Sequence, residues 1–272
     1  MDVILSAILL ILIIIVLLLA CVFVFCTKPN TFRFFDIPAA YCHRGYHSET
    51  APENSIPAFE KSAELGLGVE LDIRYTLDKK IVVFHDNDLK RLCGSDKKVS
   101  GLTFDELSQY RLLSTDEHIP LFEDVLKVCG EIPICCEIKS EDTEPDEDFL
   151  KDVYSLISSY PGQIVIESFN PYVLAWFRNN HPDIIRGQLS SGFKGRKKTF
   201  EMFLLSNLLV NVISRPDFVA YKFDDVSLGL AMNRIYGTRL VAWTVHSMDD
   251  VDTAAQNGYS TFIAEDFDLT EI

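Results

Sequence analysis

Tyr41-Cys-His-Arg-Gly-Tyr-His-Ser-Glu-Thr-Ala-Pro-Glu-Asn-Ser-Ile-Pro-Ala-Phe59 opens the globular part of this chain. Two further stretches continue its pattern, Val69-Glu-Leu-Asp-Ile-Arg-Tyr-Thr-Leu-Asp78 and Ile81-Val-Val-Phe-His-Asp86. Taken together, the three stretches place two histidines, an arginine and two carboxylates in or at the ends of short apolar runs. Side chains at the carboxyl ends of parallel strands build the active sites of α/β barrels. The pattern therefore predicts that these residues meet at one end of such a barrel.

The rest of the chain alternates between extended and helical patterns, which predicts a (β/α)8 TIM barrel. The extended candidates are Ala39–Cys42, Val69–Tyr75, Ile81–Phe84, Ile134–Ile138, Ile164–Ser168, Ile185–Leu189, Phe218–Lys222, Leu240–Val245 and Thr261–Ala264. The helical candidates are Ile56–Leu65, Thr103–Gln109, Phe122–Val128, Asp146–Ser159, Val173–Asn179, Phe200–Val212, Val226–Tyr236 and Met248–Gln256. Nine strands are one too many, so one strand is expected to be peripheral. We assign the barrel to residues 38–272, with a small insertion after the His-Asp strand at about 87–120.

The N-terminus is an almost unbroken apolar run from Val3 to Phe25. At about 1.5 Å per residue, such a helix can cross a hydrocarbon core about 30 Å thick. Asp2 precedes the run, and neither a basic segment nor a small-residue cleavage site is present, so a retained anchor (residues 1–28) is favoured over a secretory signal. Lys28 and Arg33 follow the run. The positive-inside rule therefore predicts a single-pass protein whose catalytic domain is cytoplasmic.

Composition excludes some classes of function. The formal net charge is -15, and a nucleic-acid partner would instead require a basic face. The seven cysteines contain no Cys-x-x-Cys pair, which argues against a zinc site and fits a reducing compartment.

Three carboxylates predict a metal site. Glu70 and Asp72 are two residues apart on a strand and point to one face, and Glu137 ends another apolar strand. Like charges this close repel each other unless a cation lies between them. Oxygen ligands without clustered Cys or His suit one divalent cation, Mg²⁺ or Ca²⁺. An exposed polar face is the alternative.

His43 and His85 each end an apolar strand, where a histidine can carry protons near neutral pH or simply be a satisfied core residue. Arg44 offers a charged fork to phosphate oxygens or forms a salt bridge at the barrel end. Asn54 is interpreted as a helix cap, and Glu53 as a cap neighbour or part of the polar shell of the site. His47 is expected at the surface.

The order of these motifs resembles the glycerophosphodiester phosphodiesterase family: His-Arg-Gly, Pro-Glu-Asn-Ser, Ala-Phe, Glu-x-Asp and His-Asp. The resemblance implies hydrolysis of a glycerophosphodiester to glycerol 3-phosphate and an alcohol. It implies metal ligation by Glu70, Asp72 and Glu137, and an acid–base pair of His43 and His85. Arg44 and Lys139 would then hold the phosphate. Trp243 would form a wall beside the glycerol or the alcohol, or else a core aromatic.

Two rival functions remain on the sequence alone. A lysophospholipase D would use the same site on membrane lysophospholipids, and the anchor and the apolar run from Phe200 favour it. A membrane-tethered binding protein on an enzyme scaffold would need no catalysis, and the intact motif residues argue against it.

Overall fold

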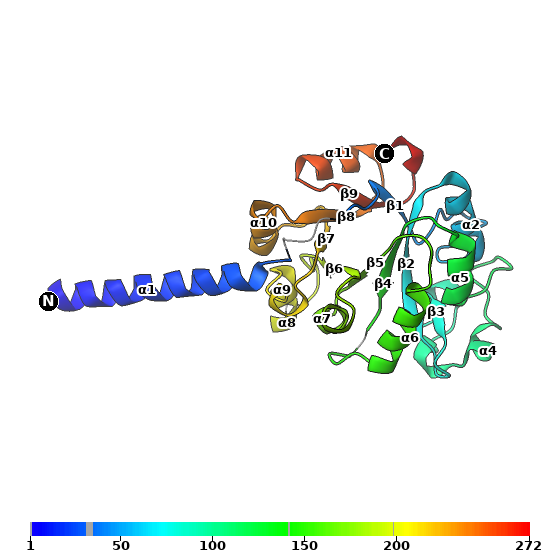
Figure 1. Cartoon of the computed structure of the whole chain (residues 1–272), viewed down its shortest axis with the longest axis horizontal. Helices are drawn as coiled ribbons and strands as arrows, with labels where there is room; N and C mark the ends of the chain where they lie inside the picture. The colour runs from blue at the N-terminus through cyan, green and yellow to red at the C-terminus, as the bar shows by residue number, and fades with distance from the viewer. Residues whose placement is uncertain (1, 31–34, 141, 198) are drawn as a thin grey trace.

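The computed structural model describes residues 2–30, 35–140, 142–197 and 199–272. Within these ranges nine strands form one sheet, which closes into a barrel because β1 pairs with both β9 and β2 (Figure 1). The strands are β1 (Ala40–His43), β2 (Gly68–Tyr75), β3 (Ile81–Val83), β4 (Ile134–Ile138), β5 (Ile164–Ser168), β6 (Ile185–Ser190), β7 (Phe218–Lys222), β8 (Arg239–Val245) and β9 (Thr261–Ala264). The predicted (β/α)8 barrel is confirmed.

The ninth strand is the peripheral one. β3 runs antiparallel to β2, pairing Ile73 with Val83, while every other strand pair in the sheet is parallel. A two-strand hairpin needs no crossover helix, which explains why the sequence shows none between these two strands.

Helices other than α1 lie around the barrel, and α1 projects from it (Figure 1). In chain order the helices are α1 (Asp2–Thr27), α2 (Ile56–Leu65), α3 (Lys90–Cys93), α4 (Phe104–Leu107), α5 (Phe122–Cys129), α6 (Glu147–Ile157), α7 (Pro171–Asn180), α8 (Phe200–Ser206), α9 (Asn211–Ser214), α10 (Leu228–Ile235) and α11 (Met248–Gln256), with short 3₁₀ turns η1 (Val99–Gly101) and η2 (Leu269–Glu271). Segment 87–120 carries α3, η1 and α4 over an apolar cluster of its own, which includes Leu89, Leu107 and Leu112.

The single helix predicted over 200–212 is wrong. The chain forms α8 and then α9, with Leu208 between them in the left-handed region at φ 55° and fully buried. Close packing against α10 accounts for the break, because a Cβ on Gly229 would lie 1.8 Å from the carbonyl oxygen of Asn207.

Alternation along the parallel strands places the site. On β2, Leu71 and Ile73 pack outward in the main core, so Glu70 and Asp72 point into the barrel. On β4, Cys136 and Ile138 pack outward in the same way. An interior apolar layer, which includes Tyr41, Cys135 and Val165, fills the barrel below the polar groups. The polar groups therefore gather at the carboxyl ends of the strands, the end at which barrels carry their sites.

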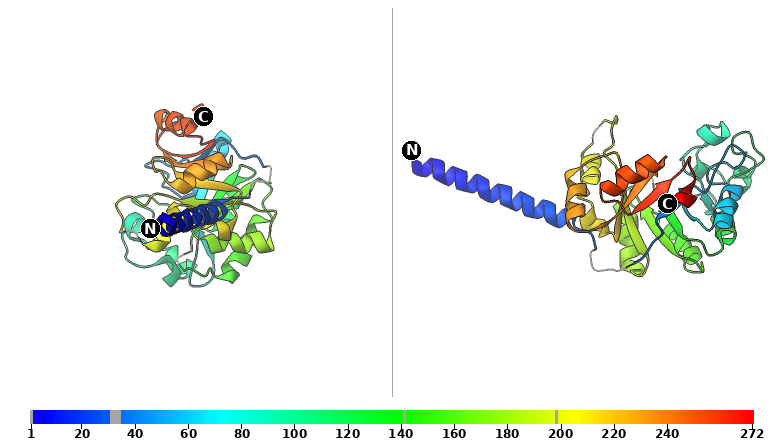
Figure 2. Two further views of the ribbon diagram at one scale, coloured as in Figure 1. Left: turned by 90° about the vertical axis from the view of Figure 1, so that its left-hand side faces the viewer. Right: turned by 90° about the horizontal axis from the view of Figure 1, so that it is seen from above.

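Helix α1 is long and apolar enough to cross a membrane from Ile4 to Thr27, a property that a signal sequence would share. Figures 1 and 2 show it projecting from the barrel beside α9 and α10, and it contacts both. Of the two basic residues used for orientation, Lys28 is exposed, whereas Arg33 lies outside the described residues.

Candidate active site

The three predicted carboxylates come together. Glu70, Asp72 and Glu137 each offer an oxygen within 4.8 Å of the others, and all three are buried. The register between β2 and β4 explains why these side chains lie close together, because Asp72 on β2 pairs directly with Glu137 on β4. The sequence spacing thus predicted a cluster that the fold forms.

Two basic side chains reach into this cluster. The Nζ of Lys139 lies 2.8 Å from Oδ1 of Asp72 and 2.6 Å from Oε2 of Glu137. The Nε of Arg44 lies 3.4 Å from Oδ2 of Asp72. These cations lower the pKa of Asp72 far below its ordinary value, although burial acts in the opposite direction.

Glu167 is a fourth interior carboxylate that sequence reasoning missed. It lies on β5 opposite Glu137 and is 1% exposed. Burial, and then repulsion from Glu137, raises its pKa to about 8. No motif marks this residue. The available signal was a lone glutamate inside the otherwise apolar run Ile164–Ser168.

The chemistry of this donor set fits a divalent cation. Four buried carboxylates face two cationic side chains, so full ionisation would leave two uncompensated negative charges. Burial, followed by repulsion from Asp72, raises the pKa of Glu70 well above its ordinary value. Buried charges normally require a partner, and hard oxygen ligands select Mg²⁺ or Ca²⁺ over softer metals.

Cation binding is therefore expected to release protons. Near neutral pH, Glu167 holds a proton in the metal-free protein because its pKa is raised to about 8. A nearby divalent cation favours the ionised carboxylates, so its apparent affinity should increase between about pH 6 and pH 8. Isothermal titration of Mg²⁺ in two buffers of different ionisation enthalpy measures this release. Equal heats in both buffers would show that no proton leaves.

His43 is held by a carboxylate that follows β9. Its Nδ1 lies 2.6 Å from Oε2 of Glu265, which also lies 3.0 Å from Nε2 of His47. Burial opposes ionisation of Glu265, yet the two histidines outweigh it and lower the pKa of this carboxyl far below its usual range. An ionised carboxylate only accepts hydrogen bonds, so Nδ1 of His43 donates and Nε2 remains for a substrate. His47, expected at the surface, instead belongs to this network.

His85 is held in the same manner. Its Nδ1 lies 2.6 Å from Oδ1 of Asp86, whose other oxygen accepts from Nε of Arg91 at 2.7 Å. Burial lowers the pKa of His85 to about 4 and outweighs the opposing effect of Asp72. Burial also lowers the pKa of His43, although Glu265 opposes this effect. Both histidines are therefore neutral near physiological pH in the free protein, with the Nε2 lone pair available for proton transfer.

A shell of polar side chains fixes Arg44. Its Nη1 donates to Oε1 of Glu53 at 2.6 Å, and Arg91 from α3 donates to the same carboxylate. The backbone of Arg44 is left-handed at φ 57°, and at Gly45 a Cβ would meet Ala58 at 3.0 Å. The Arg-Gly pair therefore makes the tight turn that aims the guanidinium at the cluster.

The interpretation of Asn54 as a helix cap is wrong. Ser55 occupies the N-cap position of α2, without a side-chain cap hydrogen bond. The Nδ2 of Asn54 instead donates to Oδ2 of Asp72 at 2.9 Å, and Asn54 is almost fully buried. Asn54 thus positions a carboxylate of the cluster, while Glu53 lies in the polar shell.

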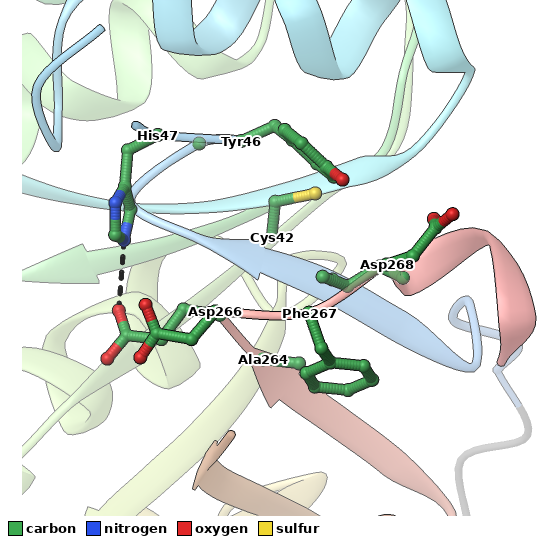
Figure 3. A pocket seen from close by; sticks show the side chains of 10 residues that line it. Cys42, Tyr46, His47, Ala264, Asp266, Phe267 and Asp268 are labelled. Carbon is green, nitrogen blue, oxygen red and sulfur yellow. Dashed lines mark hydrogen bonds and ion pairs between the residues drawn. The ribbon is translucent and has the colours of Figure 1, made fainter. Parts of the chain in front are cut away.

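Two cavities open at the loops that follow the strands. One, of about 370 Å³, lies between the loops after β1 and β9; Figure 3 shows His47 on one side and Asp266 and Phe267 across from it. A second, of about 640 Å³, has Trp243 in its wall. Phe169 packs edge-on against that Trp243, with ring centroids 5.8 Å apart. The tryptophan thus borders both the apolar interior and an open cavity.

Comparison with known proteins identifies the chain's relatives. Residues 43–269 match the model of the glycerophosphoryl diester phosphodiesterase family. A glycerophosphodiester phosphodiesterase of Caldanaerobacter subterraneus is 26% identical over 82% of this chain and 92% of its own length. A lysophospholipase D of Rattus norvegicus is 36% identical, but over 36% of this chain and 35% of its own length.

The fold has solved counterparts. A phosphodiesterase of Oleispira antarctica, solved in complex with the product sn-glycerol-3-phosphate, superposes with a TM-score of 0.69. The match covers 85% of this chain and 94% of that protein at 21% identity, which establishes a shared fold.

Proposed function

Because this chain belongs to the glycerophosphoryl diester phosphodiesterase family, we propose that it hydrolyses glycerophosphodiesters to glycerol 3-phosphate and an alcohol. One arrangement supports this most strongly. Two histidines, each with Nδ1 fixed by a carboxylate, stand beside a buried acidic cluster that also holds Arg44 and Lys139. This combination supplies proton carriers and phosphate-binding cations within one barrel mouth.

We assign the cation to Glu70, Asp72 and Glu137. A bound divalent cation would neutralise phosphate charge and lower the pKa of an attacking hydroxyl. Both Mg²⁺ and Ca²⁺ accept these oxygen ligands.

The chain's own residues supply the proton transfers. One histidine accepts the proton of the glycerol 2-hydroxyl through Nε2 as that oxygen attacks phosphorus. The other takes up a proton once the anionic phosphate lies beside it, because a nearby negative charge favours the imidazolium. It gives that proton to the departing alcohol oxygen, so the alcohol leaves neutral. Water then opens the cyclic phosphate to glycerol 3-phosphate. Arg44 and Lys139 stabilise the charge on the phosphate oxygens throughout.

Glu265 is expected to act as a positioning residue for His43. A Glu265→Gln variant cannot hold the Nδ1–H tautomer as firmly, so kcat should fall about 10–100-fold with little change in KM. Burial lowers the pKa of His43, and Glu265 partly offsets that lowering. Without the carboxylate, the limb of the kcat–pH profile that His43 sets should therefore move to lower pH. Steady-state rates across pH measure both effects.

Asp266→Asn provides a matched control, because Asp266 is adjacent, 61% exposed and paired with His246 instead. If Glu265→Gln and Asp266→Asn had the same small effect, Glu265 would have no special role.

Lysophospholipase D activity is the second candidate, and the cavity beside Trp243 favours it. Its wall includes the apolar side chains of Phe169, Phe193, Met202 and Leu205. Arg196 also lines it and offers positive charge to a lipid phosphate, while Lys194 pairs with the lining Asp225 at 2.8 Å. Such a cavity suits a substrate with a hydrocarbon part better than a small polar diester.

We further propose that α1 is retained as a single-pass anchor, with the barrel on the cytoplasmic side. The Nδ2 groups of Asn211 and Asn233, both fully buried, donate to the carbonyl oxygen of Thr27 at 2.9 and 3.2 Å. Removal of α1 would leave these amides without that acceptor, which favours retention. The cytoplasmic assignment follows the positive-inside rule.

A substrate panel tests these proposals. Purified full-length protein is assayed with glycerophosphocholine and with lysophosphatidylcholine, each with and without EDTA. Preference for the first diester supports the main proposal, and preference for the lysolipid supports the second. Binding of either without turnover would favour a non-catalytic role.

A further inference from the structure

A cavity of about 630 Å³ lies at the opposite end of the barrel, at the amino ends of the strands. It opens between the loop from α10 to β8 and the loop from α11 to β9. Its lining consists of Arg234, Gly237, Thr238, Arg239, Leu240, Gln256, Asn257, Gly258 and Ser260. We call it the base pocket. No step of the proposed reaction uses it.

The charge of the base pocket is opposite to that of the protein. Two arginines and four neutral polar side chains line it, and no carboxylate does, although the chain has a formal net charge of -15. In the part of the chain that the structure describes, neither arginine has an acidic partner within salt-bridge distance. The guanidinium carbons instead lie 5.8 Å from the ring of Tyr259 for Arg234 and 5.4 Å from the ring of Phe35 for Arg239.

These ring contacts fix the arginines without neutralising them. Arg234 also has a buried Nε that no described group accepts from. Planar guanidinium groups with free donors match the oxygens of a phosphate. The base pocket thus offers positive charge and polar side chains to a phosphate anion.

The anchor places this pocket at a membrane surface. The hydroxyl of Tyr236, at the end of α10, donates to the carbonyl of Val24 in α1 at 2.9 Å. Arg215 donates to the carbonyls of Phe25 and Lys28 and lies over the ring of Phe25. The last turn of α10 therefore lies beside the last turn of α1. The chain that follows Tyr236 leads directly into the residues that line the base pocket.

The surrounding surface agrees with this position. Ile235, next to Arg234, is 76% exposed, as is expected of an apolar side chain that meets lipid. Figure 1 shows α10 on the side of the barrel from which α1 projects.

We propose that the base pocket binds the phosphate of an anionic phospholipid headgroup in the membrane that α1 enters. This site lies at the opposite end of the barrel from the candidate active site and is independent of the proposed reaction, but it rests on the retained anchor. It would hold the barrel in a fixed orientation on the bilayer. Free phosphate shares the headgroup chemistry, but Ile235 and the hydrogen bond between Tyr236 and α1 favour the lipid.

Amide hydrogen exchange on the full chain in lipid nanodiscs tests the proposal. Discs of phosphatidylcholine alone are compared with discs that also contain phosphatidylglycerol. Exchange at 237–240 and 256–260 should slow in the anionic discs. It should not slow when inorganic phosphate is added to phosphatidylcholine discs.

The arginines are then removed as R234Q with R239Q. Each basic residue near an anionic surface contributes about 5-fold to association, so losing both should weaken it about 30-fold and abolish the protection. A control with R111Q and K90Q removes two exposed basic residues of segment 87–120, which pair with Asp116 and Asp96, and should keep the protection.

Ser260→Glu serves as a second variant, because it adds a negative charge at an exposed lining position and keeps both arginines. It should also abolish the protection while Tm stays unchanged. Equal exchange in both kinds of disc, or equal protection by inorganic phosphate, would overturn the assignment. The intact mass of the purified chain shows whether α1 is still present, so a negative result cannot come from its loss. Turnover of glycerophosphocholine reports on the active site separately.

Discussion

Replacing His43 or His85 with alanine should lower kcat by about 10²–10⁴-fold in each case, the usual contribution of a general acid or base. Each histidine has its Nδ1 held by a carboxylate, at 2.6 Å from Glu265 and Asp86 respectively, so the loss would remove a preoriented proton carrier. Initial rates on glycerophosphocholine measure the effect.

His118→Ala is the matched control, because His118 is exposed and its Nδ1 lies 2.8 Å from the carbonyl of Tyr110 in segment 87–120. It should keep wild-type activity. Tm is measured beside each rate. If a folded His43→Ala or His85→Ala variant kept near-wild-type kcat, that histidine would be a structural residue.

Removing divalent cations should abolish turnover, and adding Mg²⁺ or Ca²⁺ should restore it. The buried carboxylates cannot all be ionised without a cation, and Lys139 and Arg44 compensate for part of their charge. The metal-free protein should also melt at a lower temperature, since a ligand at 100 times its Kd adds about 2.7 kcal/mol of stability.

Glu137→Gln should weaken cation affinity, whereas Glu147→Gln on the exposed start of α6 should not. Turnover is assayed after EDTA treatment and exhaustive dialysis. Full activity of metal-stripped protein would remove the basis for assigning a cation to this cluster.

The barrel was predictable because each of its strands is marked by a pattern of residues that are close together in the sequence. Apolar runs with turn residues between them located all nine strands, and inward positions two apart on β2 predicted that Glu70 and Asp72 share a face. The helix over 200–212 was not predictable in this way. Its break at Leu208 depends on the close approach of Asn207 to Gly229, which lies in a separate helix.

The same distinction applies to the site. Residues within a dense motif, such as His43 and Arg44, could be named from their neighbours. Glu167, Glu265 and Arg91 stand alone in their segments, and their parts in the site depend on which strand ends and loops become adjacent in the closed barrel. Spacing within one segment carries no information about such contacts.

The most direct measurement is the identity of the products. Purified full-length protein with Mg²⁺ and glycerophosphocholine is followed by ³¹P NMR, with choline assayed in parallel. The proposed reaction predicts glycerol 3-phosphate and free choline in equal amounts, with a cyclic phosphate as the transient species. Phosphocholine with glycerol, or an unchanged diester in the presence of either cation, would contradict it.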